Sequence, residues 1–206
     1  MGIVSNYIWE RAADGGVNPV SLVLQQVKLR GREVCLFCVC SSPGEEIGGR
    51  MTERLTEWFH RKCLPACERK AQPGPRELLE PELRDICGEL PGQESWGYCI
   101  LLLTGNIFCL CGEGDVAVQL VNYRYNRPQM KILSTPLSGR IQRGAGLLLH
   151  TPELVRSLRQ EEICQIMHGK GLCQEEGIGR RLRELYREGR DRGNTGAVGG
   201  IYLQML

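Results

Sequence analysis

Short runs of apolar residues, bounded by glycine and polar side chains, recur along the chain. The first two are Val20–Leu29 and Glu33–Cys40, separated by Arg30-Gly31-Arg32. Runs of this length that are rich in apolar and β-branched residues are typical of β-strands. The break between them is short enough for a tight turn. The pattern therefore predicts a β-hairpin over these residues.

The next segment changes to a helical period. Between Glu45 and Lys62, apolar side chains recur at spacings of three and four residues, which places them on one face of a helix. These side chains are Ile47, Met51, Leu55, Trp58 and Phe59. Pro65, Pro73 and Pro75 then predict a loop. Pro81 suits the first turn of a second helix.

Strand-like runs return after this second helix. Tyr98–Leu103 and Ile107–Cys111 flank Thr104-Gly105-Asn106, which predicts another hairpin. The other runs that predict strands are Asp115–Tyr123, Gln129–Leu133, Gly146–His150 and Ala197–Met205.

Helical segments are predicted between the last two of these strands. Pro152 suits the start of one helix, and Ser157 with Gln160 resembles a capping box before another. The buried side of a final helix is expected to consist of Ile178, Leu182 and Leu185. The arginines of that helix alternate with glutamates, which predicts an ion-paired, solvated face.

The order of elements is strands, helices, strands, helices and a final strand. Helices grouped between runs of strands favour a layered α+β architecture over a doubly wound parallel sheet. The chain has 206 residues, with no internal repeat and no linker. We therefore expect a single domain over residues 1–206.

Composition narrows the classes of function. The chain is 42% hydrophobic and 24% charged, as ordinary globular proteins are. A net charge of +2 gives no reason to expect a nucleic-acid partner. No apolar run is long enough for a membrane span. The opening MGIVSNYIWER has neither an export signal nor a myristoylation pattern, which favours a cytoplasmic protein.

Eleven cysteines are present, an odd number that favours free thiols in a reducing compartment. If their strands pair, Cys38, Cys40, Cys109 and Cys111 share one face, where four thiolates could bind zinc. Their neighbours are apolar, so buried thiols are the favoured interpretation.

Cys63 and Arg69 have the spacing found in cysteine phosphatases. That chemistry needs a thiolate in a glycine-bearing loop between a strand and a helix. The intervening residues, LPACE, contain no glycine and follow a predicted helix. We therefore expect a helix end here and no nucleophile.

Five segments, in order along the chain, are similar to motifs of one enzyme family. They are Asn18–Leu22, Val39–Glu46, Gly112–Asp115, Arg143–Leu154 and Arg192–Val198. The corresponding motifs are Asn-Gln-Asp, Asp-Gly before a helix, Val-Gly-Asp-Ser-Arg, Gly-Asp-x-Leu-Leu-Leu ending in Asp-Gly-Leu, and Asp-Asn-x-Thr. The chain thus resembles the protein phosphatase 2C (PPM) family, in particular its bacterial, clostridial-type members.

The resemblance implies a four-layer α/β/β/α sandwich, in which helices flank two mainly antiparallel sheets. In that family, aspartates hold a pair of Mg²⁺ or Mn²⁺ ions that activate water. The positions that match this metal site are Val20, Ser41, Ser42, Pro152 and Gly193, and none of them carries a carboxylate. The residues that the resemblance places around the cleft are Gly114, Asp115, His150 and Asn194.

Three hypotheses follow from this substitution of the metal ligands. The first is a catalytically inactive pseudophosphatase, without a cofactor, that binds a protein such as a phosphoprotein or a component of a kinase circuit. The second is an active serine/threonine phosphatase that binds Mn²⁺ or Mg²⁺ through relocated ligands. The carboxylates available for this are Glu45, Glu46, Glu153 and Asp191. The third is an assembly protein that uses its outer surface and not its cleft.

Overall fold

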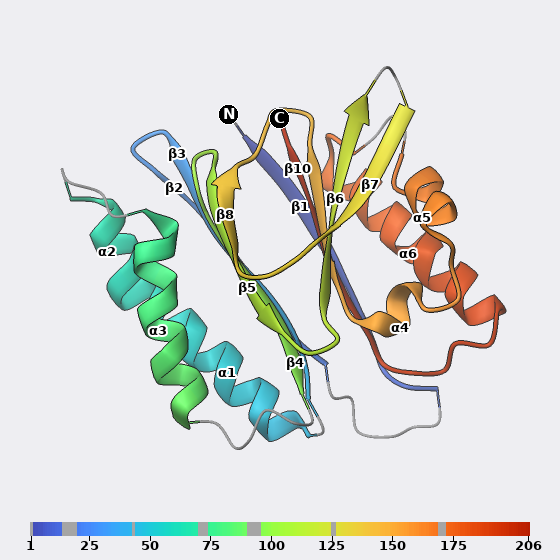
Figure 1. Cartoon of the computed structure of the whole chain (residues 1–206), viewed down its shortest axis with the longest axis horizontal. Coiled ribbons are helices and arrows are strands. Elements are labelled where there is room, and N and C mark those ends of the chain that lie inside the picture. Colours follow the sequence, from blue (N-terminus) through green and yellow to red (C-terminus); the bar gives the residue numbers. More distant parts are fainter. Residues whose placement is uncertain are drawn as a thin grey trace.

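The computed structural model describes residues 2–13, 20–42, 44–69, 74–89, 96–124, 127–168 and 172–206. Two five-stranded antiparallel sheets pack face to face between two layers of helices (Figure 1). The predicted α/β/β/α sandwich is therefore confirmed. Among the described helices, none has the length and apolar character needed to cross a lipid bilayer.

Each sheet combines strands from distant parts of the chain. Sheet A has the order β1 (Ile3–Glu10), β10 (Val198–Met205), β9 (Gly146–His150), β6 (Ala117–Arg124) and β7 (Arg127–Leu133). Sheet B has the order β2 (Val20–Leu29), β3 (Arg32–Ser41), β4 (Gly97–Thr104), β5 (Ile107–Glu113) and β8 (Leu137–Arg140).

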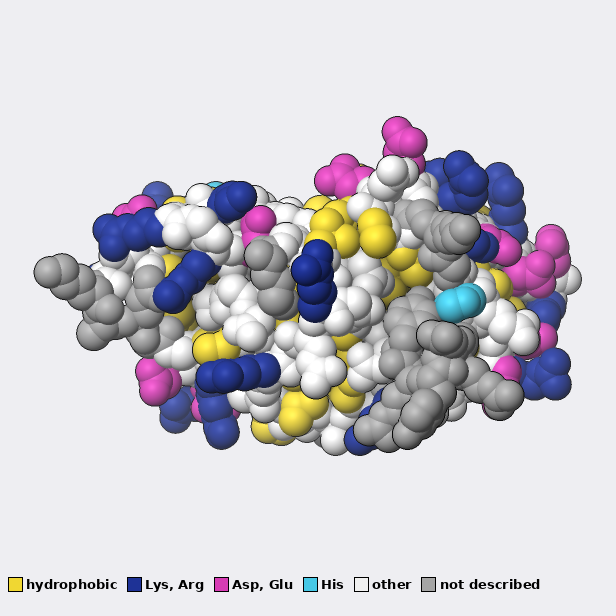
Figure 2. Space-filling model, turned by 90° about the horizontal axis from the view of Figure 1, so that it is seen from above, with side chains coloured by type: hydrophobic (Ala, Val, Ile, Leu, Met, Phe, Trp, Pro, Cys, Tyr) yellow, Lys and Arg dark blue, Asp and Glu magenta, His cyan; other side chains and the backbone are white. Residues whose placement is uncertain are grey.

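The helices form one layer on each side. Sheet B is covered by α1 (Glu45–Trp58), the π-helical turn η1 (Phe59–Cys63), α2 (Leu64–Cys67) and α3 (Pro75–Glu89). Sheet A is covered by α4 (Pro152–Val155), α5 (Gln160–Ile166) and α6 (Glu175–Asp191). Seen from above, charged side chains gather mostly over the two helical layers, and hydrophobic ones show in the band between them (Figure 2).

Three hydrophobic clusters hold these layers together. In β3, Phe37 and Val39 point between the sheets, whereas Leu36 and Cys38 point toward α1 and α3. The third cluster lies under α4–α6 and contains Ile178, Leu182 and Leu185, as predicted. Central strands are thus buried on both faces, which explains their unbroken apolar runs.

Several boundaries differ from the predictions. The helix from Glu45 continues through η1 and α2 to Cys67, so Pro65 lies inside a helix and not in a loop. The helix α3 begins at Pro75, whose missing N–H is harmless in the first turn, and Pro81 lies within it. The edge strands β1 and β8 were not predicted.

The predicted capping box is also displaced. The helix α5 begins at Gln160, and the Glu162 carboxylate accepts the backbone N–H of Arg159 at 2.8 Å. Ser157 lies in the preceding turn, where its hydroxyl donates to the Gly189 carbonyl at 3.5 Å. Ser157 therefore connects α4 to α6 and does not cap α5.

Candidate functional site

The matched metal-site positions of sheet B lie side by side at the end of the sandwich. Val20 begins β2 and Ser41 ends β3, and the two residues pair directly across the ladder. Ser41 also pairs with Gly97, the first residue of β4. The Gly114 turn follows next, because a Cβ atom on Gly114 would lie 2.7 Å from the Gly97 Cα. Gly114 has φ of 73°, a conformation that favours glycine.

Val20 closes the space between the two sheets at this end. It is buried, and its Cγ1 methyl occupies the place that a side chain on Gly199 of β10 would need. The Val20 carbonyl accepts a hydrogen bond of 2.9 Å from the Trp9 indole N–H. A methyl group thus stands where the resemblance implies a metal-binding carboxylate.

Pro152 lies next to this point, on the side of sheet A. The preceding Thr151 donates its N–H to the Gly199 carbonyl at 2.9 Å, and the Gly199 N–H reaches the Thr151 hydroxyl at 3.1 Å. Pro152 then opens α4 in its first turn. Its ring offers no atom that could bind a cation. Thr151 and Gly199 thus join the end of β9 to the start of β10 within sheet A, and nothing in the sequence indicated that either residue lies at this site.

Gly193 and Asn194 lie where α6 ends. Gly193 has φ of 86°, and its N–H donates to the Arg190 carbonyl at 2.9 Å. The Asn194 side-chain amide donates to the Glu153 carbonyl, and the Arg190 guanidinium donates to the Asn194 carbonyl at 2.8 Å. The segment therefore ties α6 to α4, and the retained asparagine serves this connection.

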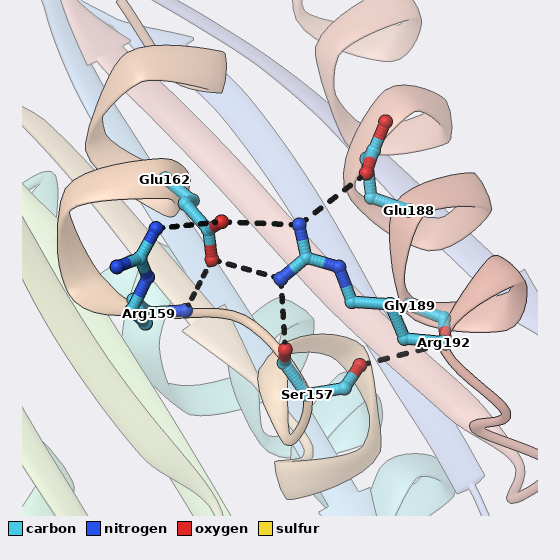
Figure 3. Close-up of polar contacts among 6 residues, drawn as sticks. All are labelled: Ser157, Arg159, Glu162, Glu188, Gly189 and Arg192. Carbon is cyan, nitrogen blue, oxygen red and sulfur yellow. Dashed lines mark hydrogen bonds and ion pairs between the residues drawn. The ribbon is translucent and has the colours of Figure 1, made fainter.

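A network of charged residues holds the end of α6 in place (Figure 3). Arg192 donates to both carboxylate oxygens of Glu162, at 2.9 and 3.0 Å, and to the Ser157 carbonyl at 3.1 Å. The Arg192 hydrogen bond and those from Arg159 lower the pKa of Glu162 to about 2. Arg192 also lies 3.6 Å from Glu188. The network ties the end of α6 to α5 and to the turn after α4.

Two further positions that the resemblance places at this site carry polar side chains: Ser42, which follows β3, and Asp115, which follows β5. Ser42 is buried and its hydroxyl donates to the Gly44 carbonyl at 2.6 Å. Asp115 is exposed in the turn after Gly114. Asp115 is thus a carboxylate-bearing residue whose backbone lies beside Gly97.

His150 does not line the strand-end surface as predicted. It pairs with Gly200 and shares a face of β9 with Leu148, which belongs to the cluster under α4–α6. It is buried, and its Nδ1 lies 2.9 Å from the Thr151 carbonyl oxygen. Burial lowers the pKa of His150, so the ring is neutral. Its Nε2 has no hydrogen-bond partner among the described residues.

The residues at this site do not fit a pair of divalent metal ions. Mg²⁺ and Mn²⁺ bind carboxylates and other hard oxygen ligands. The matched positions supply a valine methyl, two serine hydroxyls, a proline ring and a glycine. In the described part of the chain, no group of three or more His, Cys, Asp or Glu side chains is placed to hold a metal.

The carboxylates named as relocated ligands are engaged or exposed elsewhere. Glu46 pairs with Arg50 within α1, and Glu153 pairs with Arg156 at 2.7 Å. Asp191 is exposed at the end of α6. The side chain of Glu45 lies outside the described residues.

Four cysteines share a core face, but among the described residues they are not placed to hold a metal ion. Cys38, Cys40, Cys109 and Cys111 all lie in the cluster under α1–α3, with β4 between their two strands. Burial raises the pKa of Cys40 to about 12, so the thiol stays protonated. All eleven cysteines are free.

Cys63 is also unsuited to nucleophilic chemistry. It is buried within η1, and the hydrogen bond with Cys67 together with burial raises its pKa. A nucleophilic cysteine needs a lowered pKa and access to substrate.

Comparison with known proteins gives matches of structure alone. No family model and no curated protein matches the sequence. A bacterial serine phosphatase has a TM-score of 0.73 at 14% identity, covering 100% of this chain and 98% of that one. The phosphatase Stp1 from Staphylococcus aureus has a TM-score of 0.72 at 13% identity, covering 100% and 96%.

A third structure carries the metals that the resemblance implies. The catalytic domain of the serine/threonine protein phosphatase PstP, in complex with two manganese ions, has a TM-score of 0.67 at 15% identity, covering 98% of this chain and 99% of that one. These matches confirm the resemblance at the level of architecture. The chain has the fold of the bacterial serine/threonine phosphatases.

Proposed function

We propose that this chain is a pseudophosphatase: a protein with the phosphatase fold that lacks metal-dependent catalysis and acts by binding another protein. The observation that carries the proposal is the replacement of ligand oxygen by packed apolar atoms. Val20 fills the space beside Gly199, and Pro152 occupies the adjoining turn. A two-metal mechanism cannot proceed without ligands that position both ions.

The proposal extends to partner and compartment. One structural neighbour is described as PppA, a key regulatory component of T6SS in Pseudomonas aeruginosa, matched at 13% identity with a TM-score of 0.66. A regulatory role among phosphoproteins or kinases in the cytoplasm is consistent with such neighbours. Because the fold is retained, its surfaces remain available for recognition after catalysis is lost.

The test is turnover by purified protein. We expect no hydrolysis of p-nitrophenyl phosphate or of phosphothreonine peptides above the buffer rate, with Mn²⁺ or Mg²⁺ present. A manganese-dependent bacterial phosphatase of the same fold, assayed in parallel, is the positive control. Robust turnover that EDTA abolishes and that Mn²⁺ restores would establish the alternative, an active phosphatase with relocated ligands.

A further inference from the structure

A groove runs between the edges of the two sheets and borders the strand ends described above, where the Trp9 indole bonds the Val20 carbonyl. It has a volume of about 960 Å³ and lies between β1, the edge of sheet A, β2, the edge of sheet B, and the helix α1. Its walls include Tyr7 and Trp9 on β1, Leu22 and Leu24 on β2, and Glu53 and Glu57 on α1. The proposed loss of catalysis leaves this surface unaffected.

The β2 side of the groove is an open hydrogen-bonding edge. The Val20 carbonyl accepts the Trp9 N–H and therefore points away from β3. Backbone groups two residues apart in a strand point the same way. The N–H and C=O groups of Leu22 and Leu24 consequently face the groove, and no described residue bonds them from that side. Such an edge can pair with another extended chain.

The β1 side of the groove exposes two aromatic rings. Tyr7 is 55% exposed and Trp9 is 40% exposed, although both are large and apolar. The hydrogen bond to the Val20 carbonyl fixes the Trp9 ring. Arg11 lies over that ring, 5.9 Å from its centre. Rigid, accessible Tyr and Trp side chains are the residues that most often dominate binding energy at interfaces.

The α1 side of the groove carries negative charge. Glu53 forms no ion pair with the described residues, and Glu57 pairs with Arg61 at 2.9 Å, in an exposed pair of small energetic value. None of the described residues that line the groove is a lysine or an arginine. The charge of this wall therefore complements a cation.

The aromatic wall on β1 and the acidic wall on α1 would contact opposite faces of a strand added beside β2. In β2, Leu22 and Leu24 point toward sheet A, and Val23 points toward α1. A strand pairing with β2 continues this alternation. Its residues level with the leucines would meet Tyr7 and Trp9, and the residues between them would meet the glutamates.

We propose that the groove binds an extended peptide segment of a partner protein, in which apolar and basic residues alternate, by adding it as a strand beside β2. The inference deepens the proposed binding function by naming its surface and the chemistry of its partner. Backbone hydrogen bonds with β2 set the register of the peptide. Its apolar side chains pack against Tyr7 and Trp9, and its basic side chains pair with Glu53 and Glu57.

The test uses synthetic peptides and fluorescence anisotropy with the whole chain. A labelled peptide of alternating valine and lysine is expected to bind saturably. An alternating valine and glutamate peptide, and a valine–lysine peptide with N-methylated alternate amides, should each bind at least about tenfold more weakly. Equal binding of the N-methylated peptide would exclude strand addition.

Variants then locate the peptide on the surface. Tyr7→Ala should weaken binding of the alternating peptide about tenfold, and Glu53→Lys about fivefold or more at low salt. Ile132→Ala is the matched control, because Ile132 is 60% exposed on β7, the other edge of sheet A, and should stay within twofold. Circular dichroism checks that each variant is folded.

Each remaining outcome has a defined meaning. Absence of saturable binding, or binding that Tyr7→Ala leaves within twofold, overturns the inference. Concentration-dependent dimerisation abolished by Tyr7→Ala would assign the groove to a second copy of the chain and also overturn it. Metal-dependent turnover would instead refute the pseudophosphatase proposal, whether or not the peptide binds.

Discussion

The contact between Val20 and Gly199 gives the sharpest test of how the strand-end site is filled. In Gly199→Ala, the new methyl would overlap the Val20 Cγ1 and lie 3.3 Å from the Leu22 Cδ2. Neither backbone can shift easily, because Gly199 is bonded to Thr151 and Val20 to Trp9. Gly199 does not have a positive φ, so the backbone itself accepts alanine. Overpacking of this kind costs about 1–3 kcal/mol of unfolding free energy.

The second variant removes the methyls that cause the overlap. Val20→Ala deletes two buried methyl groups, a loss of about 1.6 kcal/mol at ~0.8 kcal/mol for each carbon. In the double variant, the alanine methyl at 199 enters the vacated space. We therefore expect the double variant to be more stable than the sum of the single effects by at least ~1 kcal/mol.

The assay is urea unfolding followed by circular dichroism, with the m-value as a check on two-state behaviour. Val23→Ala is the matched control, because Val23 is buried on the opposite face of β2, toward α1. Combined with Gly199→Ala, it should be additive within ~0.5 kcal/mol. A neutral Gly199→Ala, or additivity with Val20→Ala, would refute the packing described for this site.

Three further predictions concern protonation and thiol access. The Arg192 hydrogen bonds depress the Glu162 pKa to about 2, so their contribution is present above the ordinary value of 4.5 and lost as pH falls toward 2. Glu162→Gln should flatten the fall in melting temperature across that window, and an unchanged slope would count against the network. Burial depresses the pKa of His150 in the folded protein. Below the ordinary value of 6.5, His150 is therefore protonated in the unfolded chain and remains neutral in the native one. Stability should therefore fall as pH drops below 6.5, less so in His150→Gln, and NMR titration of the native ring near 6.5 would contradict this. Cys173 is the exposed thiol, Cys87 is half-buried and the other nine cysteines are buried, so native protein should react fastest with a thiol reagent at Cys173, and Cys173→Ser should lose this fast phase. Unfolded protein should react at all eleven, and several fast thiols in the native state would contradict the burial of the nine.

Much of the architecture could be predicted from local pattern. The strand β9 has the predicted bounds, and the turn between β2 and β3 falls at Arg30 and Gly31, both with positive φ. Other elements depend on contacts that a local pattern does not contain. The strand β8 has the sequence LSGR and is ordered by its pairing with β5. The strand β1 depends on its ladder with β10, from the far end of the chain.

The sequence predicts which residue types occupy the candidate site, but it does not predict how their side chains are arranged. The absence of carboxylates at positions 20, 41, 152 and 193 can be read from the sequence. The contact of Val20 with Gly199 joins distant segments and requires the packed sheets. The orientation of His150 could not be predicted, because every residue of β9 is buried and alternation cannot distinguish its two faces.

The most direct test of the central claim, that this scaffold offers no site for a pair of divalent metals, is the melting temperature with and without Mn²⁺. Two sites saturated at a hundredfold excess over Kd would together add about 5 kcal/mol, or roughly 10 °C or more for a domain of this size. We predict a change within about 1 °C at millimolar Mn²⁺, with no heat of binding in calorimetric titration. A rise of many degrees that EDTA reverses, with two ions bound per chain, would contradict the account.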